Sequence, residues 1–211
     1  MRTETPPNLS PVDARVWPFL LVGLIGYLCL VASQVTSGFL FLDRLQVGPE
    51  RAAQLVGGAL FVAGLAVALT QALVRALKGS PLTLIRLGVP LTLASFVVLT
   101  LAATFPLLLT AFALLGLGFG FLYPGFISGA TLAVSNHEQG AVAGLTGLVT
   151  GVGATLGPLF GTVLYQVGMT VPYAVSAALL LLLTVFVFVD PRLRRVADAP
   201  SSVSPVAREG G

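Results

Sequence analysis

The stretch Gly140–Gly161, which reads GAVAGLTGLVTGVGATLGPLFG, decides what kind of fold this chain adopts. It is as long and as apolar as a helix that crosses a bilayer, yet glycine recurs in it every two to four residues. Each glycine costs a helix in water about 1 kcal/mol relative to alanine, whereas a helix in hydrocarbon persists because its backbone has no other hydrogen-bonding partner. The stretch therefore predicts a membrane helix that other helices approach closely.

The glycines of this stretch fall on two faces of the predicted helix. The helix turns by about 100° per residue, so glycines three or four residues apart share a face. One face carries the first four glycines, Gly140, Gly144, Gly147 and Gly151. A second face, rotated by about 120°, carries the last three, Gly153, Gly157 and Gly161. We expect the two faces to contact two different neighbours.

The composition of the whole chain agrees with a membrane protein. Of its 211 residues, 56% are hydrophobic and only 9% are charged, which is too little polar surface for a soluble domain of this size. We therefore expect the lipid bilayer, and no nucleic acid, as a partner. Cys29 is the only cysteine and lies in an apolar run, so it predicts a small packing residue and excludes a disulfide within the chain.

Six apolar segments are long enough to cross a hydrocarbon core of about 30 Å, which predicts an all-α membrane protein with six transmembrane helices. Prolines or capping residues mark the breaks, and the short connections make sequential helices antiparallel neighbours. The predicted spans are Val16–Leu42, Glu50–Arg75, Leu82–Ala102, Pro106–Ser135, Gln139–Val167 and Val171–Val189. We expect residues 1–15 to form a polar arm, which has no secretory signal, and residues 190–211 a largely disordered tail.

The distribution of Lys and Arg predicts the orientation. Nine of these residues lie on the side of the two termini, whereas Arg44 and Arg51 alone lie on the other. By the positive-inside rule both termini and the tail are predicted to be cytoplasmic.

Polar groups and glycines are not shared equally among the spans. The third and sixth spans carry few polar atoms, which suits contact with lipid, so the other four are expected to line an interior or meet a partner. The candidate cavity-lining residues are Gln34, Thr36, Ser37, Gln71, Tyr123, Ser128, Thr131 and Thr150. The candidate packing and hinge residues are Gly125, Gly129, Gly153, Gly157, Pro158 and Gly161.

Several of these residues have a purely structural alternative. Gln34 either contacts substrate or makes a hydrogen bond between helices. Gln71 either faces a cavity or snorkels towards the nearby surface. Ser128 and Thr131 either present hydroxyls at a bend that Pro124 introduces or bond back to carbonyls of their own helix.

The middle of the spans carries no residues typical of proton transfer, metal binding or catalysis. No Asp, Glu, Lys or His lies in the middle of any of them, and the single histidine, His137, falls in a short turn. We therefore expect no metal site, no cofactor, no intramembrane proton carrier and no enzymatic activity.

The fifth span resembles the antiporter signature of the major facilitator superfamily, a glycine ladder that ends in Gly-Pro-x-x-Gly-Gly. Gly157, Pro158 and Gly161 match this ending, while Thr162 replaces the last glycine. This departure and the absence of a nearby carboxylate mean that the ladder alone does not establish antiport.

The fourth span and the turn after it are similar to the tenth and eleventh helix region of bacterial drug-efflux members. The matching positions are Gly116, Tyr123, Pro124, Gly129, Glu138, Gln139 and Gly140. The segment TQALVRALKGSP at 70–81 lacks the glycine, the aspartate and most of the basic cluster of the amino half. The resemblance is therefore to the carboxy-terminal six helices, over about residues 15–195.

The resemblance implies two inverted three-helix repeats, in which the first and fourth helices line a central cavity and the third and sixth face lipid. It also implies a secondary transporter of a bacterial-type inner membrane, exporting small amphipathic compounds when a second six-helix bundle completes it. That bundle is a second copy of the chain or a separately encoded amino half. The alternative is a truncated or non-transporting protein that keeps the half-fold.

Overall fold

The computed structural model describes residues 9–77 and 79–193, and these residues form six long apolar helices. Each helix has the length and hydropathy needed to cross a membrane. Their bounds are α1 Trp17–Leu45, α2 Pro49–Leu77, α3 Pro81–Leu101, α4 Phe105–Leu132, α5 Gln139–Val167 and α6 Val171–Val189. The six predicted spans are confirmed, because each helix boundary lies within three residues of its predicted position. Most of the predicted tail, and residues 1–8 of the predicted arm, lie outside the described residues.

Local sequence signals set the helix starts. Proline occupies the first turn of α1, α3, α4 and α6, where its missing N–H needs no partner. Before α5, a single 3₁₀ turn, η1 Asn136–Glu138, begins with the predicted capping box. Ser135 donates its hydroxyl to Oε2 of Glu138 at 2.8 Å, and the backbone N–H of Ser135 donates to the same oxygen at 3.1 Å. Ser135 therefore belongs to this turn and not to the end of α4.

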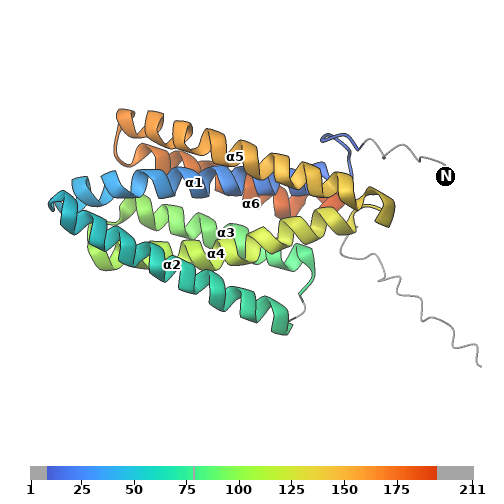
Figure 1. Ribbon diagram of the computed structural model, residues 1–211, viewed down its shortest axis with the longest axis horizontal. Helices are drawn as coiled ribbons and strands as arrows, with labels where there is room; N and C mark the ends of the chain where they lie inside the picture. Colours follow the sequence, from blue (N-terminus) through green and yellow to red (C-terminus); the bar gives the residue numbers. More distant parts are fainter. Residues whose placement is uncertain (1–8, 78, 194–211) are drawn as a thin grey trace, which may run out of the picture.

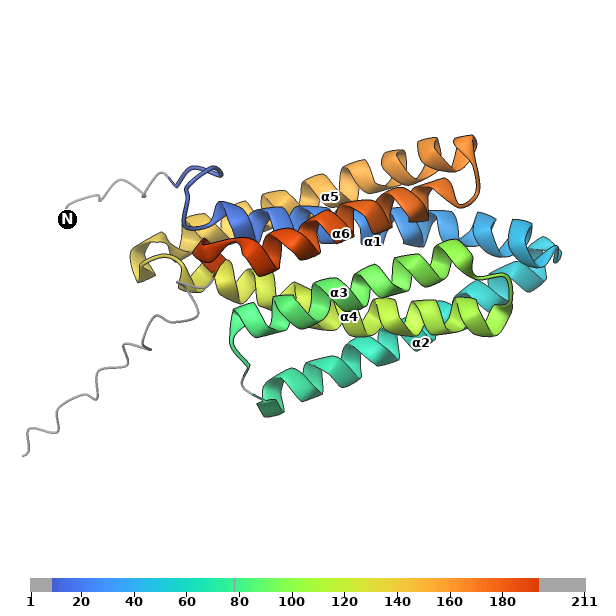
Figure 2. The ribbon, with the colours of Figure 1, turned by 180° about the vertical axis from the view of Figure 1, so that it is seen from behind.

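The helices form two layers. One broad face of the bundle is made by α5, α1, α4 and α2 in that order, with α3 and α6 behind them (Figure 1). From the opposite side, α6 and α3 lie in front (Figure 2). We call the first of these the open face. The two polar-poor helices thus lie away from it, as the sequence predicted.

The two halves of the chain interleave. The helix α2 packs mainly on α4, and α5 packs mainly on α1, so the second helix of each three-helix unit lies against the first helix of the other unit. This exchange agrees with the predicted pair of inverted three-helix repeats.

Glycine permits the tightest crossings in the bundle. A Cβ added at Gly88 of α3 would lie 2.5 Å from the backbone nitrogen of Leu122 on α4. A Cβ added at Gly118 of α4 would lie 2.6 Å from the backbone nitrogen of Thr92 on α3. On the opposite side of α4, a Cβ at Gly116 would overlap the carbonyl oxygen of Ala63 in α2. The helix α4 is thus in close contact with a neighbour on each side.

Polar contacts join the two halves at both ends of the bundle. At the end of the bundle where the described part of the chain begins and ends, which we call the terminal end, Nη2 of Arg15 lies 2.8 Å from Oε1 of Glu138. Arg15 also binds Asp13 and holds the pKa of that carboxyl below its usual value. At the far end, the hydroxyl of Tyr165 donates to Oδ2 of Asp43 at 2.6 Å and joins α5 to α1. Within the first half, Nη2 of Arg44 donates to the carbonyl of Thr100 in the last turn of α3.

Candidate functional site

A hollow of about 440 Å³ opens about halfway along the helices, between α1, α2 and α4. We call it the central hollow. Its walls are apolar, with Phe112, Leu115 and Phe119 contributed by α4. Gln34 of α1 is the one amide side chain in its lining. The amide of Gln34 makes no hydrogen bond within 9–77 and 79–193, so the interhelical hydrogen bond weighed for it is not formed among these residues.

A second hollow, of about 590 Å³, lies between α2 and α4 nearer the terminal end. We call it the lower hollow. Four of the predicted cavity residues line it together, namely Gln71, Tyr123, Ser128 and Thr131. Five of the eight predicted cavity residues therefore line one of two hollows on the same face of the bundle.

An interhelical hydrogen bond lies beside Pro124 of α4. Pro124 has no N–H, so the carbonyl of Gly120, four residues earlier, loses its normal helical partner. Nε2 of Gln71 on α2 donates to this carbonyl at 3.3 Å. Gln71 thus replaces the missing hydrogen bond and joins α2 to α4, in addition to lining the lower hollow. Snorkelling to the surface, the alternative weighed for Gln71, is not its arrangement here.

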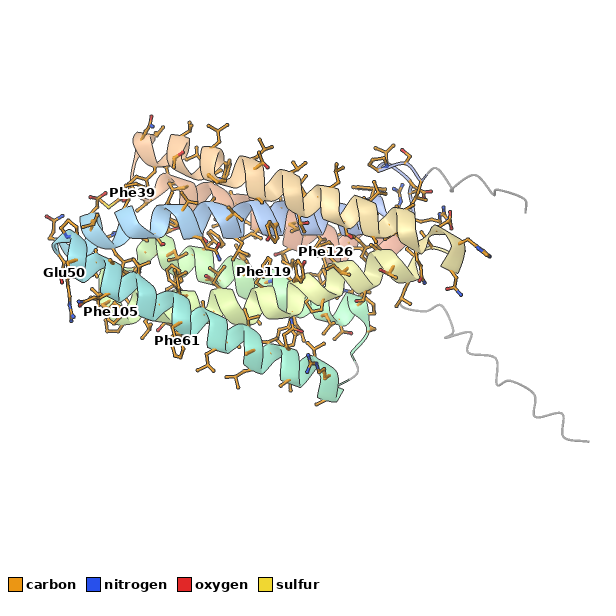
Figure 3. The ribbon with its side chains drawn as sticks, viewed as in Figure 1. Phe39, Glu50, Phe61, Phe105, Phe119 and Phe126 are labelled. Atoms are coloured by element: carbon orange, nitrogen blue, oxygen red, sulfur yellow. The ribbon has the colours of Figure 1, made fainter. Side chains whose placement is uncertain are left out.

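Aromatic side chains stand between α1 and α4 beside the two hollows. The rings of Tyr27 and Phe119 are 5.9 Å apart, and those of Phe119 and Tyr123 are 5.6 Å apart. Phe119 and Phe126 lie where α1 passes alongside α4 (Figure 3). Because Phe119 lines the central hollow and Tyr123 the lower one, this cluster separates the two.

Two of the predicted cavity residues are buried elsewhere. Thr36 and Ser37 of α1 are 0% and 1% exposed and line neither hollow. The hydroxyl of Thr36 donates to the carbonyl of Ala32 and accepts from the hydroxyl of Tyr173 on α6, at 2.8 and 2.9 Å. Ser37 donates to the carbonyl of Gln34. Helix periodicity places Thr36, two residues after Gln34, on the side of α1 away from the central hollow, where it meets Tyr173 of α6.

The other predicted hydroxyls bond to their own helices. Ser128 donates to the carbonyl of Pro124 at 2.6 Å, and Thr131 donates to that of Ile127 at 2.8 Å. Thr150 of α5 is half-buried and donates to the carbonyls of Thr146 and Gly147. Ser128 and Thr131 therefore donate their hydroxyl protons to their own helix, which is the structural alternative, although both side chains still line the lower hollow.

The two glycine faces of α5 have different surroundings. Side chains added at Gly153, Gly157 and Gly161 would contact α1, with Cβ atoms 3.1, 2.7 and 2.9 Å from their nearest neighbours. Around Gly140, Gly144, Gly147 and Gly151 there is no atom within 4 Å of an added Cβ. Gly57, Gly58 and Gly64 of α2 are equally open. One predicted neighbour of α5 is therefore α1, and its other glycine face has no neighbour among the described residues.

Charged groups are absent from both hollows among the described residues. No group of three or more His, Cys, Asp or Glu in 9–77 and 79–193 is arranged to hold a metal ion. The lining can therefore offer a ligand apolar surface, aromatic rings and the amides of Gln34 and Gln71. The sequence prediction rested on polar residues and missed Tyr27, Phe112 and Phe119. The sequence around an aromatic residue in a membrane helix is the same whether the ring faces lipid or a hollow. Glycine was the available signal, since Gly116 lines the central hollow.

Replacing Gln71 with leucine is expected to lower the free energy of unfolding by about 1 kcal/mol. The change leaves the carbonyl of Gly120 without a donor in an apolar environment, while leucine occupies a similar volume. Unfolding of the purified chain in mixed micelles measures the effect. The matched control is Gln166→Leu, at an exposed glutamine of α5 that makes no hydrogen bond within the described ranges. Equal stability of the two variants would show that the bond to Gly120 contributes nothing.

The comparisons with known proteins agree with this architecture. A family model described as Major Facilitator Superfamily matches residues 79–208, which is more than half of the chain. No curated protein matches the sequence. Among solved structures, the chain is similar to one described as the crystal structure of peptide transporter POT in complex with sulfate, with a TM-score of 0.73 and 16% identity. That similarity covers 90% of this chain but 40% of the other, and at this identity it shows the fold alone.

Proposed function

The chain belongs to the Major Facilitator Superfamily, and from that premise we propose that it is half of a secondary active transporter that works by alternating access. The active form pairs this bundle with a second six-helix bundle, and it exports small amphipathic compounds. Members of this superfamily are membrane transporters and not enzymes. The chain spans 40% of the length of the peptide transporter to which it is similar, which supports the reading as half of a transporter.

The observation that carries this proposal is the incomplete packing of α2 and α5. In the apolar stretches of these helices only 17% and 22% of residues are buried, against 50% for α1, α3 and α4. Both helices also present glycines with no atom within 4 Å of an added Cβ. Glycine on a lipid-facing surface gains nothing, whereas it permits close approach of a second helix. A partner that covers α2 and α5 would therefore satisfy the packing that the bundle leaves open.

The same partner would enclose the two hollows. Both hollows are bounded by α2 and α4, which lie side by side on the open face (Figure 1). Ligand sites in membrane transporters of this architecture lie at the interface of the repeats near the midplane. The mostly apolar and aromatic lining with two amides, Gln34 and Gln71, suits a substrate with a flat apolar body and a few hydrogen-bonding groups.

The proposed motion is a rocking of one bundle against the other, with bending at proline and glycine. The α4 pair Pro124 and Gly125 lies beside the lower hollow, and the α5 pair Gly157 and Pro158 lies in the half of that helix away from the terminal end. Pro158 removes one helical hydrogen bond, as Pro124 does. We place the termini in the cytoplasm of a bacterial-type inner membrane, because Lys and Arg concentrate at the terminal end.

Crosslinking between bundles tests the proposal. Leu148 of α5 is 55% exposed beside Gly144 and Gly147, whereas Leu182 of α6 is 68% exposed on the other side of the bundle. Leu148→Cys is expected to crosslink to a second bundle in a bilayer, and Leu182→Cys is the control that does not. The native Cys29 is buried and does not compete. The same proteoliposomes are assayed for export of a fluorescent amphipathic dye.

The partner enters the experiment in two forms. The purified chain alone tests the homodimer, and co-reconstitution with a six-helix product of an adjoining gene tests the separately encoded amino half. Dye export together with the Leu148→Cys crosslink, in either form, supports the proposal. A chain that stays monomeric and moves no dye in both forms contradicts it and favours the truncated or non-transporting alternative.

A further inference from the structure

A third hollow, of about 530 Å³, lies at the terminal end between Trp17 of α1 and the end of α6. The helix α6 lies on the side of the bundle away from the open face (Figure 2). Three exposed aliphatic residues of α6, Leu182, Val185 and Val189, form one wall. Trp17 and Phe186 form another, with their rings 5.5 Å apart. These walls are continuous with the lipid-facing surface of α6, so the hollow opens to the bilayer and not to the two hollows described above.

A stacked arginine stands at the mouth of this hollow. The guanidinium carbon of Arg192 lies 5.7 Å from the centre of the Trp17 ring. The backbone N–H of Arg192 donates to Oδ1 of Asp190 at 2.7 Å, which fixes the turn that follows α6. The guanidinium itself makes no hydrogen bond and no ion pair in the part of the chain that the structure describes. Its five N–H donors are therefore available to a ligand.

The combination of an apolar groove and a cation at its mouth matches the two parts of a phospholipid. A guanidinium binds phosphate oxygens in a bidentate manner, and tryptophan settles at the level of the headgroups. Asp190 is the one carboxylate in the lining, whereas the sequence places three arginines within four residues at Arg192, Arg194 and Arg195. The local excess of positive charge favours a headgroup with net negative charge.

We propose that this hollow binds one anionic phospholipid of the leaflet at the terminal end. The phosphate lies against the guanidinium of Arg192, and one acyl chain lies along Leu182, Val185 and Phe186. The site is on α1 and α6, so it does not depend on the second bundle or on transport.

The sequence supplies a probe at the site itself, because Trp17 is the only tryptophan in the chain. The full chain is reconstituted in phosphatidylcholine vesicles that contain a fixed fraction of one brominated lipid. That lipid is either phosphatidylglycerol or phosphatidylcholine, each with bromine on its acyl chains. Bromine quenches tryptophan fluorescence on contact, and the ratio to unbrominated vesicles removes any difference in intrinsic brightness between variants. The expected result is that phosphatidylglycerol associates about fivefold more strongly than phosphatidylcholine.

Arg192→Gln removes the proposed phosphate ligand at an exposed position and is expected to reduce this preference to less than about twofold. Arg51→Gln is the matched control, since Arg51 is an exposed arginine near the start of α2, at the opposite end of the bundle. It is expected to keep the full preference. Equal quenching by the two lipids in the unmodified chain overturns the proposal, and so does a preference that persists in Arg192→Gln.

Discussion

Replacing Gly147 with leucine is expected to reduce transport at least tenfold and to leave the stability of the isolated bundle unchanged. Apart from the adjoining backbone of α5, no atom lies within 4 Å of a Cβ added at Gly147, so the new side chain starts in open space. A substitution at such a surface position changes the free energy of unfolding by no more than about 0.5 kcal/mol. A leucine on the open face would, however, hold a second bundle away, and packing of glycine-rich helices depends on close backbone approach.

Two measurements separate these effects. Unfolding of the single bundle in detergent reports its stability, and dye export from proteoliposomes together with the Leu148→Cys crosslink reports the pairing. Gly157→Leu is the informative comparison, because its added Cβ would lie 2.7 Å from Cβ of Val31 on α1. It is expected to lower the free energy of unfolding by about 1–3 kcal/mol as well as abolish transport, without preventing membrane insertion. Unchanged transport and pairing in Gly147→Leu would show that the open glycine face contacts lipid only.

The contrast between these two glycines shows what the sequence could and could not determine. Helical periodicity separated Gly147 from Gly157 onto different faces, because the angle between residues depends only on backbone geometry. It could not say which face meets α1, since both faces have the same composition. That assignment depends on how α5 lies across α1, which is a property of the whole bundle. The same reason explains why the six spans were predicted within three residues, whereas the prediction that sequential helices are neighbours holds for α3 and α4 and is wrong for α2 and α3, which make little contact.

Polar side chains were harder to place than glycines. A hydroxyl in a membrane helix can bond to the carbonyl three or four residues earlier, so its presence does not require a cavity. Thr36 illustrates the problem, because its hydroxyl is satisfied by Ala32 and Tyr173 in a fully buried position. A primary amide has no equivalent local solution within a regular helix. Gln34 and Gln71 accordingly both line a hollow, and Gln71 also meets the carbonyl that Pro124 leaves without a donor.

Adding one methyl group at Gly88 is expected to destabilise the bundle strongly, because the methyl group would meet the backbone of α4. In Gly88→Ala the new Cβ would lie 2.5 Å from the backbone nitrogen of Leu122 and 2.8 Å from the carbonyl oxygen of Gly118. Both contacts are with backbone of α4, which cannot rotate aside as a side chain can. The helices α3 and α4 must therefore move apart. The close packing of Gly118 against Thr92 at the same crossing would then be lost as well. The expected loss is about 3 kcal/mol in the free energy of unfolding.

The matched control is Gly58→Ala in α2, which makes the same chemical change where no atom lies within 4 Å of the added Cβ. Alanine is the better helix former and restricts the unfolded chain, so this variant is expected to be as stable as the original or up to about 1 kcal/mol more stable. If Gly88 permits backbone contact between α3 and α4, the free energy of unfolding in the same mixed micelles falls in Gly88→Ala and stays the same or rises in Gly58→Ala. A loss at Gly88 no greater than at Gly58 would mean that the crossing relaxes freely, and that the glycines of α3 and α4 do not set the distance between these helices.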